Sequence, residues 1–216
     1  MKEVQMDTIH AIKERRSINF FDPAKTLSDS AIDELLRLAN LAPSSFNLQP
    51  WRVVVVSQAE SKKTLRRCAM NQQKVEEASV VLIMAADPDG VEENMDRVLE
   101  SWLALGFMKP EMRKTYSDMM LSLYGARDSL TRKLFAVKNT ALFAMNLMLA
   151  AKGLGLDTHP MDGFDEGCVK KEFNIPERMI IPMLVAIGSL KPGVNLAPRA
   201  FRRELAEFVS HETYGK

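Results

Sequence analysis

The sequence lacks several features that would each indicate a class of function. Its 29 Lys and Arg nearly balance 28 Asp and Glu, which leaves a net charge of +1, so the electrostatic footprint of a nucleic-acid-binding protein is absent. Its two cysteines and three histidines form no CxxC or metal-ligand spacing. No apolar run approaches the roughly 20 residues that span a bilayer, and the N-terminus lacks a signal peptide's apolar core. We therefore expect a cytoplasmic protein with no nucleic-acid, membrane or metal partner.

The chain does have enough apolar material for one domain. It has 216 residues, of which 46% are hydrophobic, and a chain of this size can bury a full core. No repeat, linker or glycine-rich nucleotide fingerprint is present, which disfavours a doubly wound sheet. The residue patterns indicate helices and strands that mix without regular alternation. We expect helices at 7–15, 58–68, 74–78, 129–153 and 166–173, and one from a cap at Ser28 or Ser30 to the stop at Pro43. Two more helices should lie within 87–124, broken near Gly106 and Pro110. Strands are expected at 51–56, 80–86, 156–160 and 179–188.

Three of these segments carry more detailed predictions. Residues Ser30–Asp33 fit a capping box at a helix start. The unbroken valines of Trp51–Val56 favour a strand that is buried on both faces. The stretch Ala141–Ala151 is apolar almost all the way round, and such a helix must be covered on every face. A single domain could cover it, but the partner of a dimer does so more naturally.

The loop Leu41–Trp51 has the most informative composition in the chain. It reads Leu-Ala-Pro-Ser-Ser-Phe-Asn-Leu-Gln-Pro-Trp and joins a predicted helix to a predicted strand. Pro43 and Pro50 stiffen it, while two hydroxyls and two amides supply donors and acceptors. Each residue alone suits an ordinary Ser or Asx turn. The whole string exceeds what a simple connection needs and predicts a binding loop.

Three other segments each allow a structural and a functional interpretation. Arg15-Arg16-Ser17 could be a solvated helix end or a phosphate site. Asn71 and Lys74, three residues apart, could be a polar helix cap or a pair that faces a ligand. Met161–Asp165, with Asp165 as the cap of the helix that follows, could be a plain strand–turn–helix junction, or a turn whose Gly163 admits a ligand close to the backbone.

Together these segments resemble the nitroreductase family of FMN-dependent oxidoreductases. The string Ala-Pro-Ser-Ser-x-Asn-x-Gln-Pro-Trp is a signature of that family, and the resemblance extends from Arg15 to about Phe208. It implies an α+β fold with a mostly antiparallel sheet flanked by helices, and a homodimer with a long buried interface helix and an FMN at each end of the interface. It implies that the FMN is bound by Arg15, Arg16, Ser17, Asn19, Pro43, Ser44, Ser45, Asn47, Asn71, Lys74, Pro160, Met161, Asp162, Gly163, Arg199 and Arg202.

The resemblance also assigns roles to these segments. The arginines and Ser17 would hold the flavin and its phosphate, Asn71 and Lys74 its pyrimidine edge, and a backbone N–H of the Gly163 turn its N5 atom. Loop 43–47 would reach the flavin of the other subunit. Two positions depart from the family: Asn19 stands where a basic residue is commoner, and Glu204 where a proline is usual, so the phosphate arginine could be Arg199, Arg202 or Arg203.

The function that the resemblance implies is an NAD(P)H oxidoreductase with a ping-pong cycle. A hydride would pass from NAD(P)H through flavin N5 to an acceptor such as a nitroaromatic or a quinone. The cofactor carries that chemistry, so we expect no side-chain nucleophile, and Lys74 is the candidate catalytic residue because it would tune the flavin. Two alternatives keep the same flavin loops: an FMN-storage protein without turnover, and a reductive dehalogenase.

Overall fold

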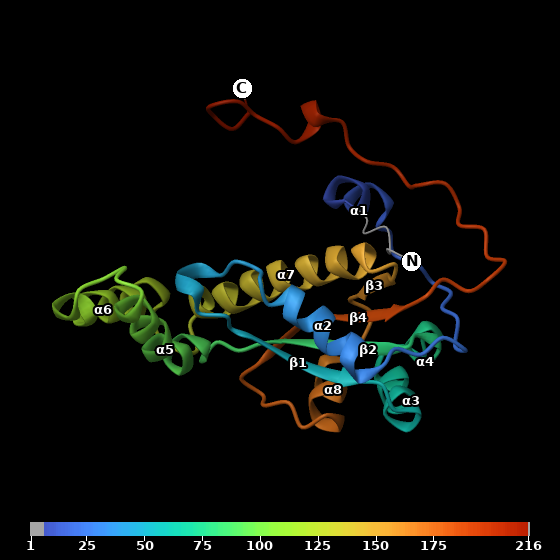
Figure 1. The fold of residues 1–216 in the computed structure, drawn as a ribbon, viewed down its shortest axis with the longest axis horizontal. Helices are drawn as coiled ribbons and strands as arrows, with labels where there is room; N and C mark the ends of the chain where they lie inside the picture. Colours follow the sequence, from blue (N-terminus) through green and yellow to red (C-terminus); the bar gives the residue numbers. More distant parts are fainter. Residues whose placement is uncertain (1–6, 216) are drawn as a thin grey trace.

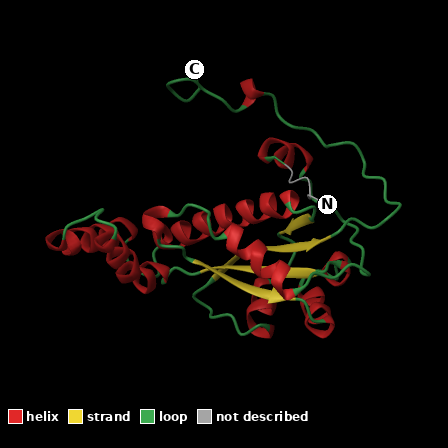
Figure 2. Ribbon diagram, viewed as in Figure 1, coloured by secondary structure: helices red, strands yellow, loops and turns green. Residues whose placement is uncertain are grey.

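The computed structural model describes residues 7–215, which form one four-stranded sheet and the helices around it (Figures 1 and 2). The strands are β1 (Trp51–Val56), β2 (Val80–Ala86), β3 (Asp157–Met161) and β4 (Ile180–Gly188), in spatial order β1-β2-β4-β3. Every neighbouring pair is antiparallel. The predicted α+β fold with an antiparallel sheet is confirmed, and each strand lies within one residue of its predicted bounds.

The helices follow the predicted order. They are α1 (Thr8–Glu14), α2 (Asp29–Ala39), α3 (Ala59–Cys68), α4 (Lys74–Glu77), α5 (Gly90–Ala104), α6 (Arg113–Tyr124), α7 (Leu130–Gly153) and α8 (Glu166–Glu172). Short 3-10 helices lie at Ser45–Asn47, Pro110–Met112 and Leu205–Glu207. The predicted break between α5 and α6 is confirmed: Gly106 has a φ of +72° and Pro110 begins the next turn.

The sheet separates two apolar layers. Successive side chains of a strand point to opposite faces, so Val81 and Ile83 of β2 pack with α3 and α8, while Leu82 and Met84 pack with α2 and α7. Figure 1 shows α2 and α7 on one side of the sheet and α3 and α8 on the other. Strand β2 is completely buried because it lies in the middle of the sheet and is covered on both faces.

Helix α7 is the largest element of the core. It is long and apolar enough to cross a membrane by length and composition alone, but half of its apolar window is buried inside this protein. Phe143 and Leu147 pack on the sheet. On another face Leu134, Leu142 and Met145 remain 59%, 43% and 40% exposed. One chain therefore covers only part of the apolar surface of α7.

Two detailed predictions are wrong. Strand β1 is not buried on both faces, because it is an edge strand, and Val55 is 40% exposed. Helix α2 is capped by Ser28, whose hydroxyl accepts from Ala31 N at 3.2 Å, so Ser30–Asp33 do not form its capping box. The first error reflects strand order, which a run of valines does not encode. The second arose because Ser28 and Ser30 both carry a hydroxyl that suits a helix cap.

The last part of the chain lies apart from the sheet. Residues 195–215 are exposed throughout, and Figure 1 shows this segment running away from the sheet and past α1 (red, upper part of the view). Its Arg199 nevertheless returns to the end of α1, where it donates to the carbonyl of Arg15 at 3.1 Å and to that of Lys13.

Candidate functional site

Two loops on one side of the sheet are joined to each other. One follows α3 and carries Asn71 and Gln72; the other follows β3 and carries Gly163. The side-chain amide of Gln72 donates to the carbonyl of Gly163 at 2.8 Å, and the backbone N–H of Asp165 donates to the carbonyl of Cys68 at 2.8 Å. The first loop turns sharply, because Asn71 has a φ of 56° and its carbonyl accepts from Arg66 at 3.1 Å.

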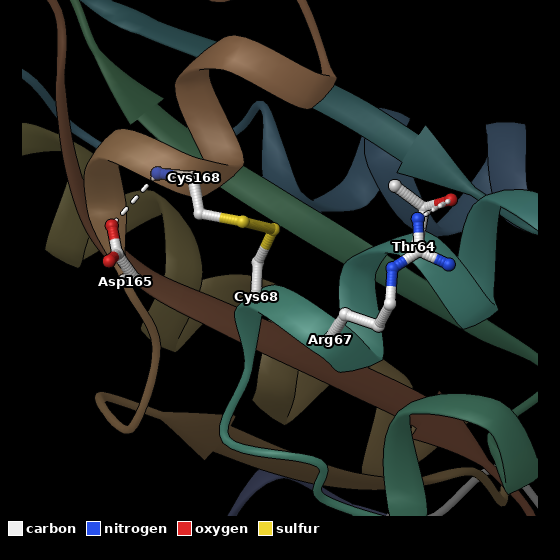
Figure 3. The surroundings of a disulfide bond; sticks show 5 residues. All are labelled: Thr64, Arg67, Cys68, Asp165 and Cys168. Carbon is white, nitrogen blue, oxygen red and sulfur yellow. Dashed lines mark hydrogen bonds between the residues drawn. A yellow bond between two sulfur atoms is a disulfide. The ribbon is translucent and has the colours of Figure 1, made fainter.

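A disulfide reinforces this junction. Cys68 at the end of α3 bonds to Cys168 in α8, with 5.5 Å between their Cα atoms (Figure 3). Asp165 caps α8 as predicted, because its carboxylate accepts from the backbone N–H of Cys168 at 2.8 Å. The spacing of the two cysteines had indicated no joint role for them. The fold brings them together across 100 residues.

Lys74 lies between two acceptors beside this junction. Its ammonium donates to Asn19 Oδ1 at 2.7 Å and contacts His159 Nε2 at 3.1 Å. The other ring nitrogen of His159 lies 2.7 Å from the carbonyl of Ile18. A carbonyl only accepts and an ammonium only donates, so the proton of a neutral His159 is on Nδ1 and Nε2 accepts from Lys74.

Burial determines the charge states in this group. It lowers the pKa of Lys74 from its ordinary value. Burial also lowers the pKa of His159, the ammonium of Lys74 acts in the same direction, and the hydrogen bond to Ile18 partly opposes both. His159 is therefore neutral near pH 7, which the contact with a protonated lysine requires.

A cluster of positive charge lies nearby at the end of α1. Burial lowers the pKa of the half-buried Arg15, and Arg199 and Arg202 lower it further. Within residues 7–215 none of these three arginines forms an ion pair with a carboxylate. Uncompensated guanidinium groups in such a cluster suit a phosphate. Arg203 instead lies over the ring of Phe208, 5.2 Å from its centroid.

The remaining residues near these groups are placed by the backbone. Ser17 forms a parallel bridge with Thr158, and Ile18 N donates to the carbonyl of Thr158 at 3.2 Å. This pairing puts the segment after α1 beside β3. The predicted residues that the fold gathers around the β3 edge of the sheet are Arg15, Arg16, Ser17, Asn19, Asn71, Lys74, Pro160, Met161, Asp162, Gly163, Arg199 and Arg202.

The loop that contains Pro43, Ser44, Ser45 and Asn47 is rigid but lies elsewhere. Ser45 N donates to Asn139 Oδ1 at 3.0 Å, and its hydroxyl lies 2.5 Å from that of Tyr124. Ser44 Oγ accepts from the backbone N–H of Gln49 at 3.0 Å. The loop therefore has a fixed shape in the free chain.

The two groups lie at opposite ends of β2. Asp87 N, just past the end of β2, donates to Pro50 O at 2.8 Å, which ties the 43–50 loop to that end. Helix α4, which begins with Lys74, leads into the start of β2 at Val80. A strand rises about 3.3 Å per residue, so the 7 residues of β2 separate the two groups by about 20 Å. Figure 1 shows α4 and the loop before β1 at opposite ends of the sheet. One chain therefore does not bring the 43–47 loop to Lys74.

Sequence reasoning missed several residues of both groups. His159 was considered only as a metal ligand, although it precedes Pro160 in a predicted flavin turn; that adjacency was the available signal. Gln72 lies between Asn71 and Lys74 and had the same signal. Tyr124 and Asn139 had none, because their contacts with Ser45 span 79 and 94 residues.

These features fit FMN. A phosphate would meet the uncompensated arginines, and the edge of a ring would meet Lys74, whose ammonium has three donors of which two are used. At Gly163 an added Cβ would lie 3.2 Å from the side-chain nitrogen of Gln72, which is a tight contact. Glycine avoids this contact and leaves no side chain over the backbone of the turn.

Comparisons with known proteins agree with this fit. The sequence model of the Nitroreductase family matches residues 12–189. The proposed NAD(P)H nitroreductase MhqN of Bacillus subtilis strain 168 is 33% identical over 202 residues, covering 94% of this chain and 97% of that protein. The crystal structure of a proposed Bacillus subtilis nitroreductase, ydfN, superposes with a TM-score of 0.88 at 32% identity, covering 94% of this chain and 97% of that one.

A further structure is informative about the ligand. A proposed nitroreductase of Exiguobacterium sibiricum, crystallised with FMN, has a TM-score of 0.84 at 28% identity and covers 94% of this chain and 96% of that one. The family match spans most of the sequence, and relatives of nearly the same length align along it. The chain therefore belongs to the nitroreductase family of FMN-dependent NAD(P)H oxidoreductases.

Proposed function

We propose that this protein oxidises NAD(P)H and reduces a small organic acceptor, such as a nitroaromatic or a quinone, in a ping-pong cycle that uses FMN. The observation that carries the proposal is the arrangement around the β3 edge of the sheet. A half-buried lysine with an unused donor and a cluster of unpaired arginines lie within one group of loops. Bound FMN would supply the hydride chemistry that links the two substrates.

The residues around this edge would divide the binding between them. Arg15, Ser17 and Arg199 would hold the phosphate through charge-assisted hydrogen bonds. Asn71 and Lys74 would bind the pyrimidine edge, and a backbone N–H in the turn at Gly163 would meet the edge that exchanges hydride. Arg16, Asn19, Pro160, Met161, Asp162 and Arg202 would complete the walls of the site.

Lys74 would act through its charge. Its ammonium would lie where reduction of the bound cofactor adds negative charge. Because the ammonium would bind the reduced cofactor more tightly than the oxidised one, it would favour reduction. Lys74 is the catalytic residue of the proposal in this sense only. No nucleophilic side chain is required, because the protein positions both substrates against the cofactor and excludes water.

The proposed functional unit is a homodimer. Within one chain, the 43–47 loop and Lys74 lie at opposite ends of β2, so the 43–47 loop of a second copy would be needed to complete each site. The exposed apolar face of α7 at Leu134, Leu142 and Met145 supports an interface along that helix. We expect the interface to bury well over the roughly 2,000 Å² typical of obligate dimers.

The proposed location is the cytoplasm. Thiols there are kept reduced, and disulfides are rare. The Cys68–Cys168 bond would then form only when the local redox conditions allow it.

The decisive experiment is an anaerobic titration of the FMN-loaded protein with NADH and with NADPH. At least one dinucleotide should bleach the flavin absorption band, and a quinone or nitroaromatic added afterwards should restore it. A yellow protein that neither dinucleotide bleaches would favour the storage alternative. A protein that cannot be loaded with FMN at all would overturn both readings, and restoration by a halogenated aromatic with halide release would favour the dehalogenase.

A further inference from the structure

We propose that His159 is a positioning residue for Lys74: together with Asn19 it forms a two-acceptor clamp that aims the lysine ammonium at the bound flavin. The inference rests on the proposed role of Lys74 as the group that tunes FMN. It adds a residue that belongs to neither the predicted site nor the arginine cluster, and it makes the tautomer of that residue part of the mechanism.

Two of the three donors of the Lys74 ammonium are already used within the chain. An ammonium has three N–H donors. Asn19 Oδ1 at 2.7 Å takes one, and His159 Nε2 at 3.1 Å takes another. One donor remains for a ligand, and its direction follows from the other two because the three are arranged tetrahedrally. A lysine on a flexible four-carbon stem thus acquires a defined direction.

His159 is itself held in place by the backbone. Its Nδ1 lies 2.7 Å from the carbonyl of Ile18, and Ile18 N is in turn bonded to the carbonyl of Thr158, the residue before His159. The ring is therefore fixed to the backbone on one side and offers an acceptor on the other. The same segment, 18–19, supports His159 through Ile18 and contacts Lys74 through Asn19, so the clamp is a closed ring of contacts.

The groups that surround His159 favour its neutral form. The groups that face its ring are the Lys74 ammonium from α4 and the Ile18 carbonyl from the segment after α1. Within residues 7–215 no carboxylate lies within ion-pair distance of it. A second proton on His159 would bring an N–H⁺ against an ammonium at 3.1 Å, so the clamp holds only with a neutral ring.

The test compares variants by the two-electron midpoint potential of bound FMN. His159→Leu removes the acceptor, so Lys74 should stabilise reduced FMN less. We expect the ratio of affinities for reduced and oxidised FMN to fall about tenfold, which is a decrease of about 30 mV for a two-electron couple. His159→Gln supplies a side-chain oxygen near the position of Nε2 and should recover most of the loss. His211→Leu, at an exposed histidine of the C-terminal segment, is the matched control and should not move the potential.

A double variant separates positioning from a direct or a structural effect. If His159 acts through Lys74, then His159→Leu should add no shift in a Lys74→Met protein. A full shift in that background overturns the inference, and so does an unshifted potential in His159→Leu or a failure of Gln to perform better than Leu.

The failure of the proposed function gives a different pattern. An unshifted potential in Lys74→Met means that Lys74 does not tune FMN, whatever His159 does. The clamp can also be tested without the cofactor, by NMR titration of the Lys74 side chain in the FMN-free protein. The pKa of Lys74 should be lower in His159→Leu than in the unmodified protein, because the variant lacks an acceptor that stabilises the charged lysine. An unchanged pKa there overturns the contact.

Discussion

Gln72 and Gly163 join the loop after α3 to the loop after β3 through one hydrogen bond. The amide of Gln72 donates to the Gly163 carbonyl at 2.8 Å, and a Cβ added at Gly163 would lie 3.2 Å from the same amide nitrogen. Glycine therefore suits position 163 for a second reason besides access to a ligand. A side chain there would press on the group that fixes the loop.

Gln72→Ala should weaken FMN binding while the protein stays folded. A neutral hydrogen bond contributes about 0.5–1.5 kcal/mol, so the dissociation constant should rise roughly 2- to 12-fold. The measurement is a fluorescence titration of the FMN-free protein. Gln73→Ala is the matched control, because Gln73 is the exposed neighbour on the same turn. Equal effects of the two substitutions would mean that the junction does not support the flavin site.

Reduction of the Cys68–Cys168 disulfide should destabilise the fold. The bond closes a loop of 100 residues, and a cross-link of that length contributes at most about 4.7 kcal/mol by restricting the unfolded chain, with about 2–4 kcal/mol typical. Urea unfolding with and without a dithiol reductant measures the difference. The double variant Cys68→Ser with Cys168→Ser should match the reduced protein and should not respond to the reductant. Detection of two free thiols in the denatured, unreduced protein would contradict the bond.

Arg15→Ala should weaken the binding of FMN but not that of riboflavin. A charge-assisted phosphate contact is worth about 1.5–3 kcal/mol, so FMN affinity should fall roughly 10- to 150-fold. Riboflavin has no phosphate and should bind both proteins alike. Arg37→Ala removes an exposed arginine of α2 and serves as the control. If both flavins lost affinity equally, Arg15 would support the loops and not the phosphate.

The secondary structure was largely predictable because its signals are local. The apolar run of β2 and the Asp165 cap of α8 each lie within a few residues, and both are confirmed. The edge position of β1 was not predictable in this way. Four consecutive valines suit a buried strand in any position, and the strand order that exposes Val55 is set by pairing with β2 alone.

The candidate site was predictable only in part for the same reason. Asn71 and Lys74 share a short motif, and the resemblance to a family extends over it. The contact between Lys74 and His159 spans 85 residues, and the cysteines meet across 100. Such contacts depend on how β3 and α8 dock beside α4, which no local pattern encodes. Adjacency to Pro160 could have placed His159 near the predicted turn, but not its contact with Lys74, which depends on the geometry around that lysine.

Leu142→Glu should convert a dimer into a monomer that binds FMN poorly. Leu134, Leu142 and Met145 recur at helical spacing on one face of α7 and are exposed in the single chain. A carboxylate buried at an interface without a partner costs several kcal/mol, and each 1.4 kcal/mol weakens association about tenfold. Sedimentation velocity at micromolar concentration should therefore show a dimer for the unmodified protein and a monomer for the variant.

The same substitution tests whether each site needs two copies. Lys74 and the 43–47 loop lie at opposite ends of β2 in one chain, so a monomer would keep the phosphate contacts and lose those of the loop. FMN affinity should fall along with dimerisation. Ala59→Glu is the control: it adds the same charge at an exposed position of α3, on the opposite side of the sheet, where an acidic residue suits the start of a helix. A monomer that still binds FMN with full affinity would show that one chain makes the whole site, and would require the 43–47 loop to serve another purpose.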